Sequence, residues 1–186
     1  MLENSNVRLR APEPDDLELL YTWENDPDVW RVSSTRGPIS RLALKNHIKH
    51  ASLDIYQTKQ LRLMIELQAD PPQTVGVADL FHFDPFHQRA EVGLLIGSPQ
   101  HRGKGLASST LDLLQNYCFG FLGLRQLYCN IASSNERCVQ LFLGHGFELV
   151  GEKRMWLRTS SGWDGELLLQ RINPHPNGER RDYISS

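Results

Sequence analysis

The sequence predicts an α+β fold, a single domain in which helices flank one mixed, mostly antiparallel sheet. Its 186 residues fit one domain with its own core, since domains usually contain about 100 to 200 residues. Three successive segments read as the strands of an antiparallel meander. A glycine-containing turn then leads into a segment with apolar residues at helical spacing. These observations predict the element order βααβββαβαββ.

The first part of the chain predicts one strand followed by two helices. Residues 7–10 alternate like a short strand, and the prolines that follow end it. The aspartates at 15–16 suit the electropositive start of a helix, and a second helix is predicted to begin near Ser40. The acidic, proline-interrupted residues 24–28 connect the two helices.

The middle of the chain predicts three consecutive strands. Residues 61–67 alternate most clearly, and the segment 70–73 with its two prolines ends the run. Residues 74–83 and 90–96 continue the pattern on either side of a turn at 84–87. We therefore expect an antiparallel meander here.

A helix and a strand follow the meander. Residues 97–105 are rich in glycine and polar side chains, and they open a helix that Gly123 closes. Residues 127–131 form the next predicted strand. The apolar stripe of the helix consists of Ala107, Leu111, Leu114, Cys118 and Phe121.

The last part predicts a short helix and a hairpin. Ser133 and Glu136 are spaced as a capping box, before a helix that ends at Gly144 or Gly146. Two strands, 148–158 and 166–172, flank a turn at 160–162. The domain is thus expected to span residues 1–172, and the polar residues 173–186 are expected to form a mobile tail.

Charge and composition exclude several classes of partner. Twenty Lys and Arg residues against 22 Asp and Glu give a net charge of -2, without the basic excess that favours nucleic acids. Three cysteines do not suggest a disulfide framework and fit a reducing compartment. No segment approaches the roughly 20 apolar residues of a membrane span, and residues 1–6 lack the pattern of a secretory signal. We predict a cytoplasmic protein that binds neither nucleic acid nor membrane.

The turn at residues 100–107 is the most informative motif for chemistry. Its two glycines allow a tight turn, and free N–H groups at the start of the next helix favour an anionic group such as pyrophosphate. An ordinary strand-to-helix turn would carry the same glycines, so both interpretations remain open. The patterns of a Walker A loop and of a dinucleotide-binding fold are absent.

The pattern Gln100-x-x-Gly103-x-Gly105-x-Ala107 resembles the acyl-CoA pyrophosphate motif of the GCN5-related N-acetyltransferases (GNAT superfamily). Residues 90–96 resemble the strand that leads into that motif, and residues 135–147 (NERCVQLFLGHGF) resemble a downstream segment of the family. The resemblance covers about residues 6–172. Within the family, the segment 89–91, the glycine turn and its helix look most like the spermidine N-acetyltransferases and their neighbours that modify ribosomal-protein N-termini.

The resemblance implies that acetyl-CoA, with no metal, lies in a splay between the fourth and fifth predicted strands. The implied cofactor-binding residues are Leu94, Leu95 and Ile96 for the pantetheine arm, His101, Arg102, Gly103, Lys104, Gly105, Leu106 and Ala107 for the pyrophosphate, and Asn135 and Phe142 from the following helix. Arg102 and Lys104 could pair with phosphates or simply face solvent. Asn135 could instead only cap its helix.

Acetyl transfer to a primary amine by direct attack requires the neutral amine, so a base must remove a proton near pH 7. Glu91 is the predicted base, because relatives carry a glutamate at the matching position. We expect an apolar setting among Phe81, Phe83 and Val92, where a carboxylate is more basic. The alternative is a surface carboxylate at a strand end, and Glu66 on the neighbouring strand is the reserve candidate.

Phe142 departs from the family pattern, since many relatives have a tyrosine there that is thought to protonate the departing CoA thiolate. Phenylalanine cannot donate a proton. Water is then the expected proton source, because a thiol of ordinary acidity leaves tolerably as thiolate. Tyr117, Tyr128 and Cys138 are possible substitutes, although each also fits a packing role.

Several acceptors and roles remain open from the sequence. Glu24, Asp26 and Asp28 form an acidic segment that could attract a polyamine such as spermidine, or could be a solvated loop. A protein N-terminal amine is the alternative acceptor, and a non-catalytic acyl-CoA-binding sensor or interaction module is the alternative role. A homo-oligomer is plausible for the family. His82 and His87 flank a turn without enough further ligands for a metal.

Overall fold

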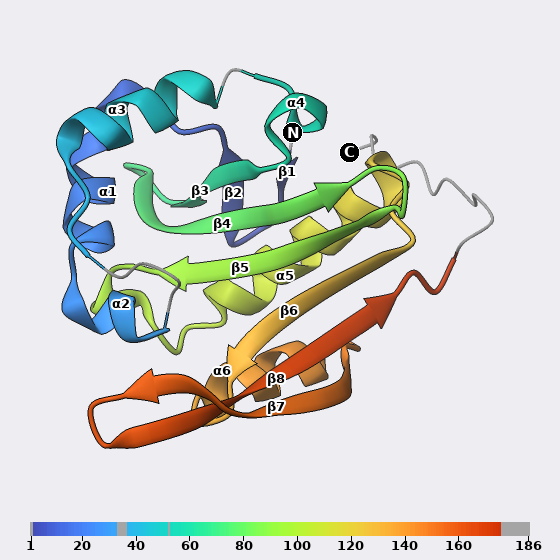
Figure 1. Cartoon of the computed structure of the whole chain (residues 1–186). Helices are drawn as coiled ribbons and strands as arrows, with labels where there is room; N and C mark the ends of the chain where they lie inside the picture. Colours follow the sequence, from blue (N-terminus) through green and yellow to red (C-terminus); the bar gives the residue numbers. More distant parts are fainter. Residues whose placement is uncertain (1, 33–36, 52, 176–186) are drawn as a thin grey trace.

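The computed structural model has an α+β fold built on one open sheet, and it describes residues 2–32, 37–51 and 53–175 (Figure 1). The sheet contains eight strands in this part of the chain, in the order β1-β2-β3-β4-β5-β6-β8-β7. The strands are β1 (Leu2–Glu3), β2 (Val7–Arg10), β3 (Leu61–Leu67), β4 (Gln73–Asp84), β5 (Arg89–Ile96), β6 (Gln126–Ala132), β7 (Glu148–Thr159) and β8 (Gly162–Ile172). Their mixed, mostly antiparallel arrangement confirms the predicted fold class.

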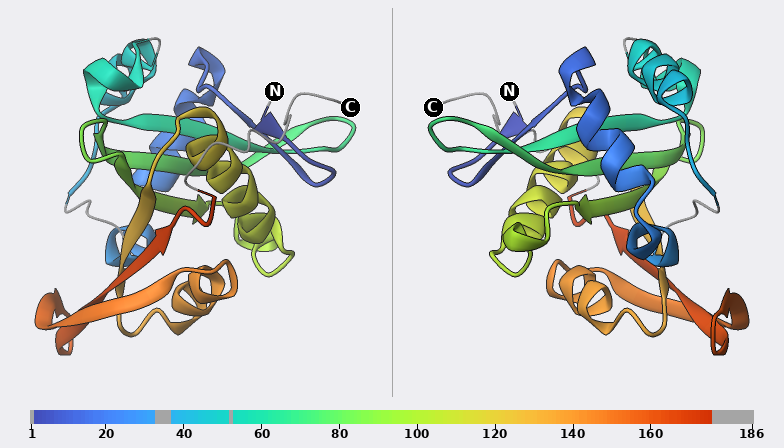
Figure 2. Two further views of the ribbon diagram at one scale, coloured as in Figure 1. Left: turned by 90° about the vertical axis from the view of Figure 1, so that its right-hand side faces the viewer. Right: turned by 90° about the vertical axis from the view of Figure 1, so that its left-hand side faces the viewer.

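Helices cover both faces of the sheet (Figure 2). The α-helices are α1 (Leu17–Glu24), α2 (Pro27–Val32), α3 (Arg41–His50), α4 (Ile55–Thr58), α5 (Leu106–Asn116) and α6 (Glu136–Gly144). Short 3₁₀ turns are η1 (Pro14–Asp16) and η2 (Pro99–His101), and η3 (Tyr117–Phe121) is a π-turn. No helix within the described residues is long and apolar enough to cross a membrane.

Two apolar clusters lie on opposite faces of the sheet. The larger one joins Leu111 and Leu114 of α5 and Phe142 of α6 to buried residues of the central strands, such as Val92. The smaller one places Trp23 of α1 and residues of α3 against β3 and β4. Because side chains alternate along β5, Val92 faces α5 whereas Glu91 and Leu95 face the side of α1 and α3.

The strands β5 and β6 run parallel and separate after a short contact. Their pairing is restricted to Arg89 with Gln126, Ala90 with Leu127 and Glu91 with Tyr128. Beyond Glu91, β5 pairs only with β4 and β6 pairs only with β8 within the described residues. This divergence is the splay that was predicted between the fourth and fifth strands.

The seven predicted strands all occur, and the short elements β1, α2 and α4 were not predicted. β1 has two residues, too few to show alternation, and it is set by pairing Leu2 with Leu9. The connecting segment around residues 24–28 contains the start of α2, in which Pro27 occupies the first turn. These short elements depend on tertiary contacts more than on local pattern.

Two details of the expected helices are wrong. The predicted capping box does not form, because Asn135 is the N-cap of α6 and its side chain accepts from the Cys138 N–H. Phe121 does not belong to the buried stripe of α5, since the chain widens into η3 and leaves this side chain 78% exposed. Of the predicted tail, Asn173 is bonded to Leu124 and Arg125, and residues 176–186 lie outside the described residues.

Candidate functional site: the splay between β5 and β6

The splay leaves two strand edges facing each other without a strand between them. Residues 92–96 of β5 and 129–132 of β6 have no strand partner on these edges in the described part of the chain. Unpaired N–H and C=O groups at a strand edge can bond an extended ligand in place of a missing strand. The predicted pantetheine residues Leu94, Leu95 and Ile96 lie on this edge. Amide groups of a pantetheine arm fit such an edge.

The glycine turn directly follows the β5 edge and leads into α5. Gly103 and Gly105 have φ angles of 80° and 77°, left-handed values that favour glycine. Gly105 is the N-cap of α5 and offers no side chain, so the N–H groups of the first helical turn receive no side-chain cap. Leu106 anchors the turn in the core. Free helix-start N–H groups and a backbone without side chains fit a pyrophosphate group.

Three cationic side chains surround this turn. Arg102 donates from Nε to the Ile96 carbonyl at 2.9 Å, which ties the turn to the end of β5. Lys104 is exposed. Arg137 of α6 was not predicted, and its guanidinium lies so close to Gly103 that a Cβ there would be 2.9 Å from Nη2. Only the folded chain brings α6 to this turn, so no local sequence signal marks Arg137.

Glu91 is the last residue of β5 that pairs with β6, so it lies where the splay opens. One carboxylate oxygen, Oε1, accepts from Nδ2 of Asn130 on β6 at 2.9 Å. The other, Oε2, lies 2.8 Å from Nδ1 of His82 on β4. The Glu91 side chain is 18% exposed. The carboxylate is therefore held at both oxygens yet reachable from solvent.

The apolar setting expected around Glu91 forms only in part, because Phe81 pairs with Glu91 and its ring lies at Gly93 on the same face of the sheet. Phe83 belongs to the core on the opposite face of the sheet. A bulge in β4 between Phe81 and Asp84 instead turns His82 toward Glu91. Polar partners thus bond both carboxylate oxygens beside Phe81, and Phe83 leaves this face because the bulge breaks the alternation on which the expectation relied.

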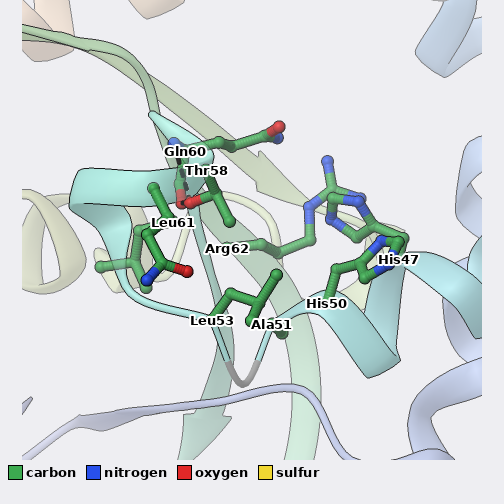
Figure 3. A pocket seen from close by; sticks show the side chains of 9 residues that line it. His47, His50, Ala51, Leu53, Thr58, Gln60, Leu61 and Arg62 are labelled. Atoms are coloured by element: carbon green, nitrogen blue, oxygen red, sulfur yellow. Dashed lines mark hydrogen bonds between the residues drawn. The ribbon is translucent and has the colours of Figure 1, made fainter.

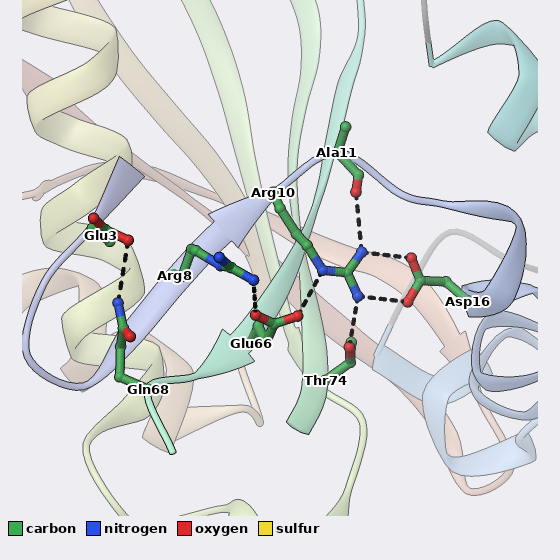
Figure 4. Close-up of polar contacts among 8 residues, drawn as sticks. All are labelled: Glu3, Arg8, Arg10, Ala11, Asp16, Glu66, Gln68 and Thr74. Atoms are coloured by element: carbon green, nitrogen blue, oxygen red, sulfur yellow. Dashed lines mark hydrogen bonds and ion pairs between the residues drawn. The ribbon is translucent and has the colours of Figure 1, made fainter. Parts of the chain in front are cut away.

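The reserve candidate Glu66 is unsuited to the role of a base (Figure 4). Arg8 donates to its Oε1, and Arg10 donates to its Oε2 at 2.8 Å. Burial would raise the pKa of Glu66, but the two arginines outweigh it and lower the pKa below its ordinary value. A carboxylate that holds its proton so weakly is a poor base for an amine.

The residues downstream of the splay mainly pack and cap. Phe142 is 2% exposed and contacts Phe147 edge to face at 4.9 Å between ring centroids. Asn135 caps α6. Burial raises the pKa of Tyr117 and Tyr128 and raises that of Cys138 to about 11, which makes each a weaker proton donor at neutral pH. The predicted cofactor contacts of Asn135 and Phe142 remain predictions.

The acidic segment at 24–28 does not present all its carboxylates to solvent. Glu24 is buried and accepts from Nη1 of Arg62 at 2.5 Å. Asp28 is exposed and pairs with Arg31. The expected cluster is therefore divided, since its first member neutralises a buried arginine.

Other carboxylate side chains lie along the end of β6, and no pattern in the sequence predicted them there. Glu152 accepts from Ser133 at 3.3 Å, and Asp164 accepts from the Ser134 N–H at 3.3 Å. Lys153 bridges Glu166 at 2.6 Å and Asn130 at 3.4 Å. Glu91, Asp164 and Glu166 lie beside β6 on one face of the sheet together with Lys153, an arrangement that suits a cationic ligand. The Glu152 carboxylate lies over Gly165 on the opposite face.

A separate cavity of about 370 Å³ lies among α3, α4 and β3 (Figure 3). Its lining includes His47, His50 and Arg62 and shares no residue with the splay edge or the glycine turn. Burial lowers the pKa of His47, and nearby Arg62 lowers it further, so this imidazole is neutral at pH 7.

Comparisons with known proteins show which family the chain resembles. The family model described as "Acetyltransferase (GNAT) domain" matches residues 6–148. The spermidine N(1)-acetyltransferase of Escherichia coli K12 is 28% identical over 148 residues, which cover 79% of this chain and 75% of that protein.

Two solved structures from Vibrio cholerae share the fold. Spermidine N-acetyltransferase in complex with CoA and spermine has a TM-score of 0.81 at 23% identity, covering 91% of this chain and 97% of that one. A dodecameric structure of spermidine N-acetyltransferase in an intermediate state has a TM-score of 0.77 at 23% identity, covering 92% and 96%. At this identity the likeness concerns the fold.

Proposed function

The chain belongs to the GNAT acetyltransferase family and is an acetyl-CoA-dependent N-acetyltransferase, and we propose that its acceptor is a polyamine such as spermidine. The observation that carries the acceptor is the group of three carboxylates on one face of the sheet beside the splay, Glu91, Asp164 and Glu166. A polyamine carries several positive charges at pH 7, so it gains from such a surface. The names of the relatives support the same acceptor.

The chain's own groups would hold acetyl-CoA in the splay. The edge residues Leu94, Leu95 and Ile96 would supply backbone groups for the pantetheine arm. Within 101–107, the N–H groups of His101 and Arg102 already donate to Ser98 and Pro99, so those of 103–107 would face the pyrophosphate. Lys104 and Arg137 add positive charge, while Arg102 fixes the turn through the Ile96 carbonyl. When bound, acetyl-CoA supplies the acetyl group as a thioester.

The acceptor amine must lose a proton before it can attack the thioester carbon. We place this proton transfer beside Glu91, where the splay opens and where a carboxylate combines negative charge with contact to solvent. Direct attack by the amine needs no covalent enzyme intermediate. At position 142 the chain has a buried phenylalanine, so the CoA sulfur leaves as thiolate or takes its proton from water.

Thiol release from acetyl-CoA, measured with a thiol reagent over a panel of amines, tests the acceptor. The panel contains spermidine, spermine, short peptides with free N-termini and an amine-free blank. We expect saturable release with the polyamines. Release with peptides alone would replace the polyamine by a protein N-terminus, and CoA binding without release on any amine would favour the sensor role.

Self-association is part of the proposal for this family member. The dodecameric neighbour supports it, and the edge strand β7 with β8 exposes Met155, Trp156 and Trp163 by more than half. Sedimentation of the purified chain tests it, and a monomer at all concentrations would contradict it. The cytoplasmic location remains a prediction.

A further inference from the structure

His82 lies in an unusual backbone conformation beside Glu91. The bulge in β4 gives His82 a φ angle of 49°, a left-handed value that is uncommon for residues other than glycine. Its side chain is 75% exposed, whereas Glu91 is mostly covered. Strained residues of this kind persist when the surroundings hold them, and they concentrate at functional sites.

The contact between the two side chains fixes which nitrogen of His82 carries the proton. An ionised carboxylate only accepts hydrogen bonds, so Nδ1 must donate to Glu91 Oε2 across the 2.8 Å contact. In the neutral ring, Nε2 then keeps its lone pair. The ring's exposure leaves Nε2 able to meet an amine or water.

Glu91 is itself held in place for this role. Asn130 donates to its Oε1, and Asn130 in turn accepts from the ammonium of Lys153. The carboxylate therefore cannot rotate away from His82 without losing a hydrogen bond. A charged, fixed carboxylate stabilises the imidazolium that forms when Nε2 takes a proton.

We propose that Nε2 of His82 takes the proton from the acceptor amine, and that Glu91 is the positioning residue that orients the ring and stabilises its charge. The inference rests on the proposed function. The N–H bond of the ammonium breaks and its electron pair stays on the amine nitrogen, while an Nε2–H bond forms. The imidazolium then returns this proton to water.

The chemistry favours histidine over the carboxylate as the acceptor. General bases work best when they titrate near the working pH, and histidine ordinarily does so at about 6.5. Other charged or titratable groups near the pair are Asp84 and Arg89, which bond each other at 3.4 Å, Tyr128 on β6 and Lys153 on β7. Among the contacts within the described residues, Glu91 is the charged partner of His82.

The decisive variant is His82→Asn, because asparagine tolerates a left-handed φ and can still donate to Glu91 but cannot take a proton. His87→Asn in the exposed turn that follows β4 is the matched control. We expect His82→Asn to lower kcat/KM at pH 7 by about a hundredfold or more and to remove the acidic limb of its pH profile. CoA binding and KM for acetyl-CoA should not change, and His87→Asn should resemble the wild type.

Glu91→Gln separates the two roles. If Glu91 only positions the ring, this variant loses less rate than His82→Asn and keeps the acidic limb that His82→Asn removes. If His82→Asn keeps the wild-type rate and profile while Glu91→Gln abolishes turnover, the carboxylate is the base and the inference is wrong.

Nitrogen-15 NMR of labelled histidine gives a second readout that needs no turnover. We expect His82 in the Nδ1–H form in the wild type and a loss of this preference in Glu91→Gln. An Nε2–H form in the wild type would overturn the inference. If the wild type released no thiol with any amine of the panel, the proposed function would be wrong. If the wild type was active and His82→Asn was equally active, only the further inference would be wrong.

Discussion

Carboxylates on the central strands are held in two different ways. Asp79 of β4 is bonded by Arg62 through Nε at 2.7 Å and Nη2 at 3.0 Å, and its side chain is 7% exposed. Glu91, on the adjacent strand and the same face of the sheet, contacts an amide and an imidazole, and within the described part of the chain it pairs with no arginine. The two sites differ in the permanence of the partner's charge.

An arginine remains charged throughout the physiological range, so Arg62 supplies a permanent counter-charge to the buried carboxylate of Asp79. Burial alone would lower the pKa of Arg62, but Asp79 and Glu24 more than offset this and raise it above its usual value. An imidazole can gain and lose a proton near neutral pH. Burial of a carboxylate therefore does not by itself indicate a functional site. The side chain that bonds the carboxylate determines whether the pair can transfer a proton.

The largest effect is expected from Arg62→Met. The side chain of Arg62 is 12% exposed, and its removal leaves Asp79 and Glu24 buried without a counter-charge. Because breaking such a buried ion pair costs about 3 to 5 kcal/mol, we expect the variant to lose this much free energy of unfolding. Urea denaturation measures the loss.

Arg41→Met is the matched control, since the exposed pair of Arg41 with Glu18 is highly solvated. Its unfolding midpoint should stay close to that of the wild type. Equal losses in the two variants would show that the buried cluster is no more important than a surface pair.

A smaller and pH-dependent effect is expected from Arg10→Met. Arg10 donates to Asp16 and Glu66. Burial would raise the pKa of Asp16, but Arg10 and the Glu13 N–H outweigh it and lower the pKa. With lowered pKa values in the folded state, these carboxylates stabilise the protein above about pH 4 and lose this contribution as the pH falls through their folded values.

The variant should therefore be about 2 kcal/mol less stable than the wild type at pH 7 and should approach it below pH 4. Urea denaturation at a series of pH values measures this difference. A difference that stays constant across the series would contradict the assignment of Arg10 to these carboxylates.

The smallest effect on stability is expected from Glu91→Gln. Glutamine can keep a hydrogen bond to Asn130, and no arginine is left without its partner, so we expect a loss of about 1 kcal/mol or less. The same urea assay measures it. A loss as large as that of Arg62→Met would place Glu91 among the structural carboxylates and would break the distinction between the two sites.

The sequence predicts the parts of the fold that depend on local periodicity. The strands 61–67 and 90–96 and the helix after Gly105 carry regular patterns, and the structure confirms them. Short elements such as β1 and α2 are not predicted, because a few residues cannot show a period. The wider turn η3 is not predicted either, and the position of Phe121 is therefore wrong.

The candidate site shows the same limit. The glycine turn and Glu91 stand out in the sequence through a motif and a resemblance. His82, Arg137 and the carboxylates beside β6 do not, because a bulge and contacts between distant segments bring them together. Alternation places a side chain on one face of a strand only while the register is unbroken.

The packing of Trp23 on Gly97 gives the chain an optical probe. Trp23 is 6% exposed, and a Cβ at position 97 would lie 2.3 Å from its ring, so the indole rests on the residue that follows β5. Trp156 and Trp163 on the hairpin are each 58% exposed. A soluble quencher should therefore reduce the fluorescence of the hairpin tryptophans first. Part of the remaining fluorescence comes from Trp23, beside the start of the glycine turn.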